Sequence, residues 1–210
     1  MKSFAVSILF FCSLSMAAQG GQSKKLLDKL SKKFDTYQTL ELNLDLEIFY
    51  PEETPEKRTV RLIQSNSKFF FDTEDQRVIG DGQSVWYILK QRNEVQISDY
   101  DGEEDLGVPT PGFILREYKD GQFESALVSK KGQIAEIDLK PLEDSDYSKL
   151  KILINTKENQ LKEVTAYGKD GSRVHLVLKS LKPNESYPSE TFAFREADFP
   201  GIFIEDLRID

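Results

Sequence analysis

The residue types that most often perform chemistry are few and scattered in this sequence. His175 is the only histidine and Cys12 the only cysteine, and they lie far apart along the chain. A transition-metal site or a catalytic triad needs several such side chains in one place. The sequence therefore predicts neither kind of site.

Carboxylates are abundant, but their spacing matches no familiar site. The clusters Glu103-Glu104-Asp105 and Glu143-Asp144-Ser145-Asp146 lack the glycine and the distal glutamate of a calcium loop. No two carboxylates are marked out as a glycosidase pair, and the sequence has no phosphate-binding glycine loop and no Gly-x-Ser-x-Gly motif. We expect no catalytic residue, no metal and no cofactor. A hydrolase that uses scattered carboxylates is the last of the alternatives.

Aromatic side chains are the residues of this sequence best suited to form a binding site. The chain holds 14 Phe and 8 Tyr, and some of them cluster in Phe69-Phe70-Phe71 and Trp86-Tyr87. Most aromatic residues of a globular protein belong to its core. We therefore expect a core role for the majority and a ligand role for only a few.

The first 18 residues have the pattern of a signal peptide. Lys2 precedes an apolar run from Phe4 to Leu14, and small residues follow at Ala17 and Ala18. The run is shorter than the roughly 20 residues that cross a bilayer. We expect secretion, with residues 1–18 removed and residues 19–210 forming one domain.

Two further features narrow the class of protein. Cys12 follows two phenylalanines instead of the small residues of a lipoprotein signal, so lipid attachment is not expected. Removal of the signal peptide would leave a chain without thiols or disulfides. The formal net charge of −8 makes nucleic acid a poor electrostatic match, since phosphate backbones attract basic surfaces.

The hydrophobic pattern predicts one helix followed by many strands. Apolar residues at three- and four-residue spacing indicate an amphipathic helix over residues 23–37, with Ser23 as its N-cap. Strict alternation from Leu40 to Tyr50 indicates a strand with one apolar face. Weaker alternation recurs at 60–63, 69–71, 135–139, 150–154, 161–167 and 174–178.

Turn residues indicate that these strands pair as antiparallel neighbours. Asp81-Gly82 and Asp170-Gly171 each stand between strand-like runs and suit tight hairpins. Asp101-Gly102 and Asp120-Gly121 bracket a stretch with two prolines, which predicts a loop running into a short helix from about Phe113. The fold class is mainly β.

Taken in order, these segments resemble one known family, the periplasmic outer-membrane lipoprotein carrier proteins (LolA). The resemblance is sharpest at Val78–Tyr87, where Asp81-Gly82 and Trp86 match the family's Asp-Gly-x-x-x-Trp hairpin. It continues through Thr110–Leu115 and the strands from Leu150 to Leu178. It closes with Phe192-Ala193-Phe194, Pro200-Gly201 and Ile204–Arg208.

The resemblance implies a fold, a function and a site. The fold would be an unclosed antiparallel β barrel with helices forming a lid over its concave apolar side. The function would be that of a chaperone that shuttles lipoproteins from an inner-membrane release transporter to an outer-membrane acceptor. The residues expected to contact the acyl chains are Leu62, Phe69, Phe71, Trp86, Phe113, Ile114 and Leu115.

One departure from the family leaves the lid in question. Family members carry a basic residue, which helps to hold the lid closed, and a proline just before the aromatic strand, where this chain has Ser65 and Asn66. Arg58 or Arg61 is a candidate substitute, although we favour a solvent-facing position on a strand for each of them. Two other functions stay open on the same fold: a carrier of a free lipid or glycolipid, and a regulatory domain that senses lipoproteins.

Overall fold

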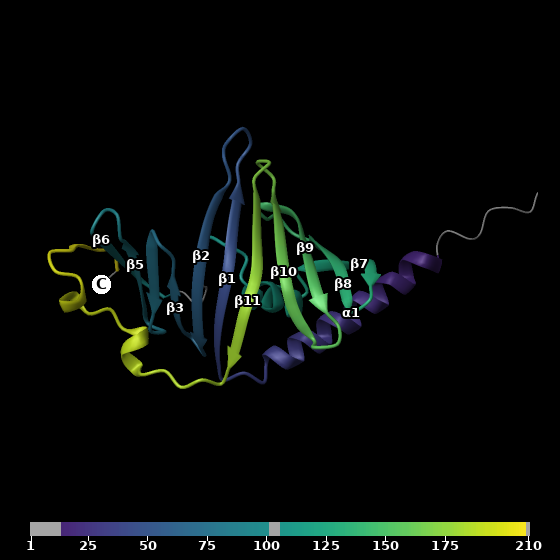
Figure 1. The fold of residues 1–210 in the computed structure, drawn as a ribbon, viewed down its shortest axis with the longest axis horizontal. Helices are drawn as coiled ribbons and strands as arrows, with labels where there is room; N and C mark the ends of the chain where they lie inside the picture. The colour runs from purple at the N-terminus through teal and green to yellow at the C-terminus, as the bar shows by residue number, and fades with distance from the viewer. Residues whose placement is uncertain (1–13, 101–105, 209–210) are drawn as a thin grey trace, which may run out of the picture.

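A computed structural model describes residues 14–100 and 106–208, with side chains from residue 21 onward (Figure 1). Most of the predicted signal peptide lies outside these residues, as do the Asp101-Gly102 pair and the cluster Glu103-Glu104-Asp105. The described residues form a 12-stranded sheet. Its strands are β1 (Thr39–Phe49), β2 (Glu56–Ser65), β3 (Lys68–Asp72), β4 (Gln76–Gly80), β5 (Ser84–Leu89), β6 (Glu94–Asp99), β7 (Phe123–Lys131), β8 (Ile134–Pro141), β9 (Tyr147–Asn155), β10 (Gln160–Gly168), β11 (Arg173–Pro183) and β12 (Phe203–Asp206).

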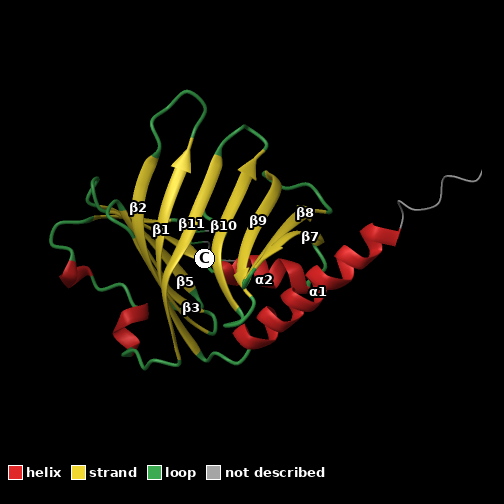
Figure 2. Cartoon of the chain, turned by 45° about the vertical axis from the view of Figure 1, so that its right-hand side comes forward, coloured by secondary structure: helices red, strands yellow, loops and turns green. Residues whose placement is uncertain are grey.

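The sheet is curved but not closed. Its order is β12-β6-β5-β4-β3-β2-β1-β11-β10-β9-β8-β7, so that β12 and β7 stand at opposite ends. Every neighbouring pair is antiparallel except β12 and β6, which are parallel. Figure 2 shows the sheet wrapping around the two helices. The prediction of an unclosed, mainly antiparallel β barrel with helices on its concave side is confirmed.

The strand predicted most clearly occupies the centre of the sheet. Strand β1 pairs with β2 on one side and β11 on the other. Leu40, Leu42, Leu44 and Leu46 are all buried in the main apolar cluster. Because alternate residues of a strand point to the same face, these leucines line the concave side.

The predicted Asp-Gly turns are present and have a local cause. Asp81 Oδ1 accepts hydrogen bonds from the backbone N–H groups of Gln83 at 2.8 Å and Ser84 at 2.9 Å. Gly82 has a φ of +89°, which a side chain would strain. The turn therefore fixes the register of β4 against β5. Asp170-Gly171 connects β10 to β11 in the same way.

Helix α1 (Leu14–Phe34) is longer than predicted and begins earlier. Ser23 lies inside it, so its assignment as the N-cap is wrong. The helix passes through Ser23 without interruption, and the Ser23 hydroxyl bonds outward to Ser125 on β7, at 3.2 Å to the carbonyl and 2.9 Å to the hydroxyl. The helix thereby packs against a strand at one end of the sheet. Among the described helices, none is long and apolar enough to span a membrane.

A second apolar cluster lies on the convex face of the sheet. Trp86 stacks on Phe194 with ring centroids 6.4 Å apart, and Phe194 stacks on Phe199 at 5.5 Å. These rings pack with Ile79 and Ile202 among others. The chain after β11 carries Phe194, Phe199 and Ile202 across this face before β12 joins the sheet beside β6 (Figure 1).

Candidate functional site

The concave face of the sheet is covered by a short helix, α2 (Pro111–Lys119). It begins two residues before the predicted start, because Thr110 serves as the N-cap and Pro111 occupies the first turn. The Thr110 hydroxyl accepts a hydrogen bond from the Phe113 N–H at 3.2 Å. Ile114 and Leu115 point inward and are buried in the main apolar cluster.

Five of the seven predicted binding residues meet in this cluster. Leu62, Phe69, Phe71, Ile114 and Leu115 are each no more than 4 % exposed. The first three come from β2 and β3, and the last two from α2. Phe113 is half-buried and packs against the same cluster. The structure therefore joins the aromatic strand to the covering helix, as the resemblance implied.

The Phe69 ring fills the space beside a glycine on the neighbouring strand. A Cβ atom at Gly80, its partner on β4, would lie 2.2 Å from Phe69 Cε1. The ring thus occupies the space that a side chain at position 80 would need. Phe70, the next residue, points to the convex face and packs with the second cluster. Phe69 and Phe70 thus face opposite sides of the sheet, as adjacent residues of a strand do.

The structure does not bring Trp86 to this group. Trp86 and Ile88 belong to the convex cluster, whereas Val85 and Tyr87 contact the concave one. The Asp-Gly-x-x-x-Trp pattern indicates a hairpin but not which face its tryptophan occupies. Alternation along β5 was the available signal for Val85 and Tyr87, which the sequence reasoning missed.

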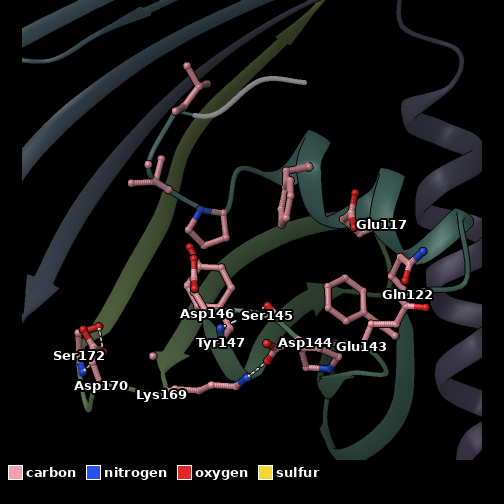
Figure 3. A pocket seen from close by; sticks show the side chains of 18 of the residues that line it. Glu117, Gln122, Glu143, Asp144, Ser145, Asp146, Tyr147, Lys169, Asp170 and Ser172 are labelled. Atoms are coloured by element: carbon pink, nitrogen blue, oxygen red, sulfur yellow. Dashed lines mark hydrogen bonds and ion pairs between the residues drawn. The ribbon is translucent and has the colours of Figure 1, made fainter. Parts of the chain in front are cut away.

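An open cavity of about 1200 Å³ lies beside α2, at one end of the curved sheet (Figure 3). It is lined by residues from four separate parts of the chain. Its apolar wall consists of Leu106, Val108, Pro109, Phe113, Phe123, Pro141 and Tyr147. Its polar residues include Arg116, Glu117, Glu143, Asp144, Asp146, Lys169 and Asp170. Phe113 is the predicted residue that lines it.

Two of the acidic residues around this cavity, Asp144 and Asp170, are engaged by residues of the adjacent loops. Lys169 forms an ion pair with Asp144, and its hydrogen bond lowers the pKa of that carboxyl. The Asp170 carboxyl accepts hydrogen bonds from the N–H and hydroxyl of Ser172 (Figure 3). In the part of the chain that the structure describes, no three His, Cys, Asp or Glu residues form a group suited to a metal ion. These contacts stabilise the loop between β8 and β9 and the loop between β10 and β11.

A smaller hollow of about 370 Å³ lies on the other flank of α2. Its lining includes Phe34 and Tyr37, next to Leu40 of β1 and Gln64 of β2. Arg116 of α2 lines both hollows. The helix therefore has open space along both flanks.

Polar contacts to α1 hold the outer side of α2. The Tyr118 hydroxyl lies 2.6 Å from Asp28 Oδ1, and Lys119 Nζ lies 2.9 Å from Asp35 Oδ1. Burial and the hydrogen bond to Asp28 raise the pKa of the Tyr118 hydroxyl, so it stays protonated as a donor. These two bonds join α2 to α1 and not to the sheet.

Ser65 and Asn66 occupy the position where family members carry the basic residue that helps to hold the lid closed. Ser65 ends β2, and Asn66 forms the following turn with a φ of +54°. Gln64, one residue earlier, lies against the first turn of α2, since a Cβ at Gly112 would be 3.2 Å from its amide end. Arg58 pairs with Glu56 and Asp75. Arg61 pairs with Glu41 on the convex face, so neither arginine is available to α2 in this structure.

Comparison with known proteins gives a family and a fold. The family model described as outer membrane lipoprotein carrier protein LolA matches residues 62–195, more than half of the chain. A solved structure of an uncharacterised conserved protein from Thermus thermophilus is similar at 9 % identity and a TM-score of 0.57, over 88 % of this chain and 99 % of that one. A LolA superfamily protein from Nitrosomonas europaea aligns at 12 % identity and a TM-score of 0.44, over 82 % and 97 %. The search of curated proteins gave no match.

Proposed function

The chain belongs to the family of outer membrane lipoprotein carrier proteins (LolA), and on that premise we propose that it carries lipoproteins through the periplasm by enclosing their acyl chains. The carrier acts without catalysis and without a cofactor. The acyl chains take the place of the α2 side chains against the concave face of the sheet. An inner-membrane release transporter supplies the cargo, and an outer-membrane acceptor receives it.

One observation supports this proposal above the others. Helices cover the apolar concave face, where an ordinary β sandwich would have a second sheet. Leu27 and Leu30 of α1 pack into the buried cluster, and the short helix α2 lies over it. The helix contributes Ile114 and Leu115 to the buried cluster, and hollows run along both of its flanks. A short helix with open space on both sides can be displaced by a large apolar ligand, which would then pack against the sheet in its place.

The affinity for acyl chains should be moderate, because binding them replaces the contacts that α2 makes in the empty protein. Burying an acyl chain yields about 0.8 kcal/mol per methylene. Moving α2 aside exposes Ile114 and Leu115 and breaks the Tyr118–Asp28 and Lys119–Asp35 contacts, which offsets part of that gain. The cargo is held firmly enough for transport and can still be given up to an acceptor.

The cavity beside α2 gives the acyl chains a route inward. Phe113 stands between the cavity and the buried cluster, because it lines the first and packs against the second. Acyl chains that enter along the apolar wall would meet Phe113 and then Leu62, Phe69 and Phe71. The polar residues of the cavity would stay beside the peptide part of the cargo.

The proposal is tested by the binding of a fluorescent triacylated lipopeptide. We expect saturable binding of this probe to the purified protein and none of the same peptide without its acyl chains. Native mass spectrometry of protein purified from its own periplasm then identifies the natural cargo. A small lipid in place of a lipoprotein would replace our proposal with a free-lipid carrier, and absence of probe binding would contradict acyl binding itself.

A further inference from the structure

Three lysines form an exposed line along helix α1. Lys25, Lys29 and Lys32 are spaced so that they share one face of the helix, and all three are exposed. Within the described residues no ion pair or hydrogen bond engages their ammonium groups. The neighbouring lysines differ, since Lys24 pairs with Asp28 at 3.6 Å and Lys33 donates to the Glu158 carbonyl at 2.8 Å.

The opposite face of α1 is packed against the rest of the protein, so the three lysines point away from it. Leu27 and Leu30 are fully buried in the main cluster. Asn159, in the turn between β9 and β10, donates to the Lys29 carbonyl at 2.8 Å. Lys157 of the same turn is exposed as well. The turn also carries Glu158, whose carboxylate pairs with Lys162 at 3.0 Å, so that the line itself consists of the three lysines of α1.

This basic strip is a local feature of an acidic protein. The chain has a formal net charge of −8, yet residues 24–33 contain five lysines and a single aspartate. A positively charged strip on a negatively charged protein orients the molecule when it approaches a negatively charged partner. A partner that recognises this strip by its charge would be anionic.

The composition of the strip favours a membrane over a protein as that partner. Protein interfaces are depleted in lysine and are built around aromatic and apolar side chains. From residue 21 onward, the exposed large apolar side chains lie elsewhere, and none of them is on α1. A flat anionic lipid surface needs no shape complementarity and attracts nearby lysines at about 1 kcal/mol each.

We propose that Lys25, Lys29 and Lys32 dock α1 onto the anionic surface of a phospholipid membrane. The attachment is weak and reversible, because three lysines act against the net negative charge of the molecule. Docking places α2 near the lipid surface, since Tyr118 of α2 bonds to Asp28 of α1. The proposal concerns the protein surface alone and does not depend on the cargo.

Vesicle co-sedimentation at low ionic strength tests the proposal. We expect the purified protein to bind vesicles of phosphatidylcholine mixed with phosphatidylglycerol and not vesicles of phosphatidylcholine alone. The triple variant Lys25→Glu/Lys29→Glu/Lys32→Glu should bind the mixed vesicles at least about tenfold more weakly, given the contribution per lysine. Added salt should release the unchanged protein, because exposed charges are screened.

A matched control separates this surface from the change in net charge. Lys68→Glu/Arg92→Glu/Lys140→Glu makes the same charge change at exposed residues on other elements and should lose less than the α1 variant. A Lys25→Gln/Lys29→Gln/Lys32→Gln variant serves if the glutamates disturb folding, and circular dichroism checks each protein. Equal losses in the two triple variants, or no preference for anionic vesicles, would overturn the proposal. Binding of the triacylated probe in solution should be unchanged in both.

Discussion

Glutamate in place of Phe69 should destabilise the protein by several kcal/mol and abolish binding of an acylated probe. Phe69 is 1 % exposed and packs against Gly80 and the Leu62–Phe71 face of the sheet. A buried carboxylate without a partner costs several kcal/mol. In the open form, the same carboxylate would face the acyl chains. Thermal melting and probe titration measure the two effects.

Two companion variants distinguish a binding role from a purely structural one. Phe70→Glu makes the same change one residue away, on the convex face near Arg61 and Arg77, and should leave probe binding intact. Phe69→Leu removes ring atoms without adding charge, at a cost of about 1–3 kcal/mol, and should weaken binding of the folded protein. If Phe69→Leu loses stability but binds the probe normally, Phe69 is ordinary core and our assignment of the site is wrong.

Replacing Glu41 by glutamine should cost about 3 kcal/mol of stability at neutral pH and almost nothing near pH 2. Glu41 is buried on the convex face, with a side chain 5 % exposed. Burial by itself would raise the pKa of its carboxyl. Hydrogen bonds from Lys182 at 2.8 Å, Arg61 at 2.7 Å and Tyr187 at 3.1 Å outweigh burial and hold the pKa at about 2.

The sign of the pH dependence follows from that lowered pKa. The folded protein holds Glu41 ionised down to about pH 2, whereas the unfolded chain protonates it near 4.5. The stabilisation is therefore complete above pH 4.5 and is lost as the pH falls toward 2. Urea unfolding at several pH values measures it.

Asp45→Asn is the matched control for Glu41→Gln. Asp45 lies on the same strand and pairs with Lys179 at 3.1 Å, but both side chains are more than half exposed. Surface ion pairs contribute about 0–1 kcal/mol, so this variant should lose little. A loss for Glu41→Gln that does not change with pH would contradict the assigned role of the charged carboxylate.

Alternation and turn chemistry allowed most of the sheet to be predicted. Apolar residues at every second position from Leu40 to Tyr50 indicate a half-buried strand, and β1 follows that pattern. Asp81 and Gly82 predict the hairpin that the structure contains. Two prolines that break any strand predicted a short helix from about Phe113, and the Thr110 cap explains why it begins at Pro111 instead. These signals are local, so one sequence is enough to read them.

Features that depend on distant contacts could not be read in this way. Trp86 faces the convex side because a covering segment more than 100 residues later supplies Phe194. Strand β12 pairs in parallel with β6, which no neighbouring turn indicates. The cavity is assembled from residues near 106–109, 123, 141–147 and 168–172. Because these segments lie far apart in the sequence, no single one of them indicates the cavity.

Covalent closure of α2 tests the central claim most directly. The double variant Gln64→Cys/Gly112→Cys places two thiols close together, since a Cβ at position 112 lies 3.6 Å from the side-chain carbonyl carbon of Gln64. A short cleavable crosslinker then joins β2 to α2, with Cys12 replaced by serine and the single-cysteine variants as controls. We predict that crosslinking abolishes binding of the triacylated probe and that cleavage of the linker restores it. Unchanged binding by the crosslinked protein would show that acyl chains do not enter beneath α2.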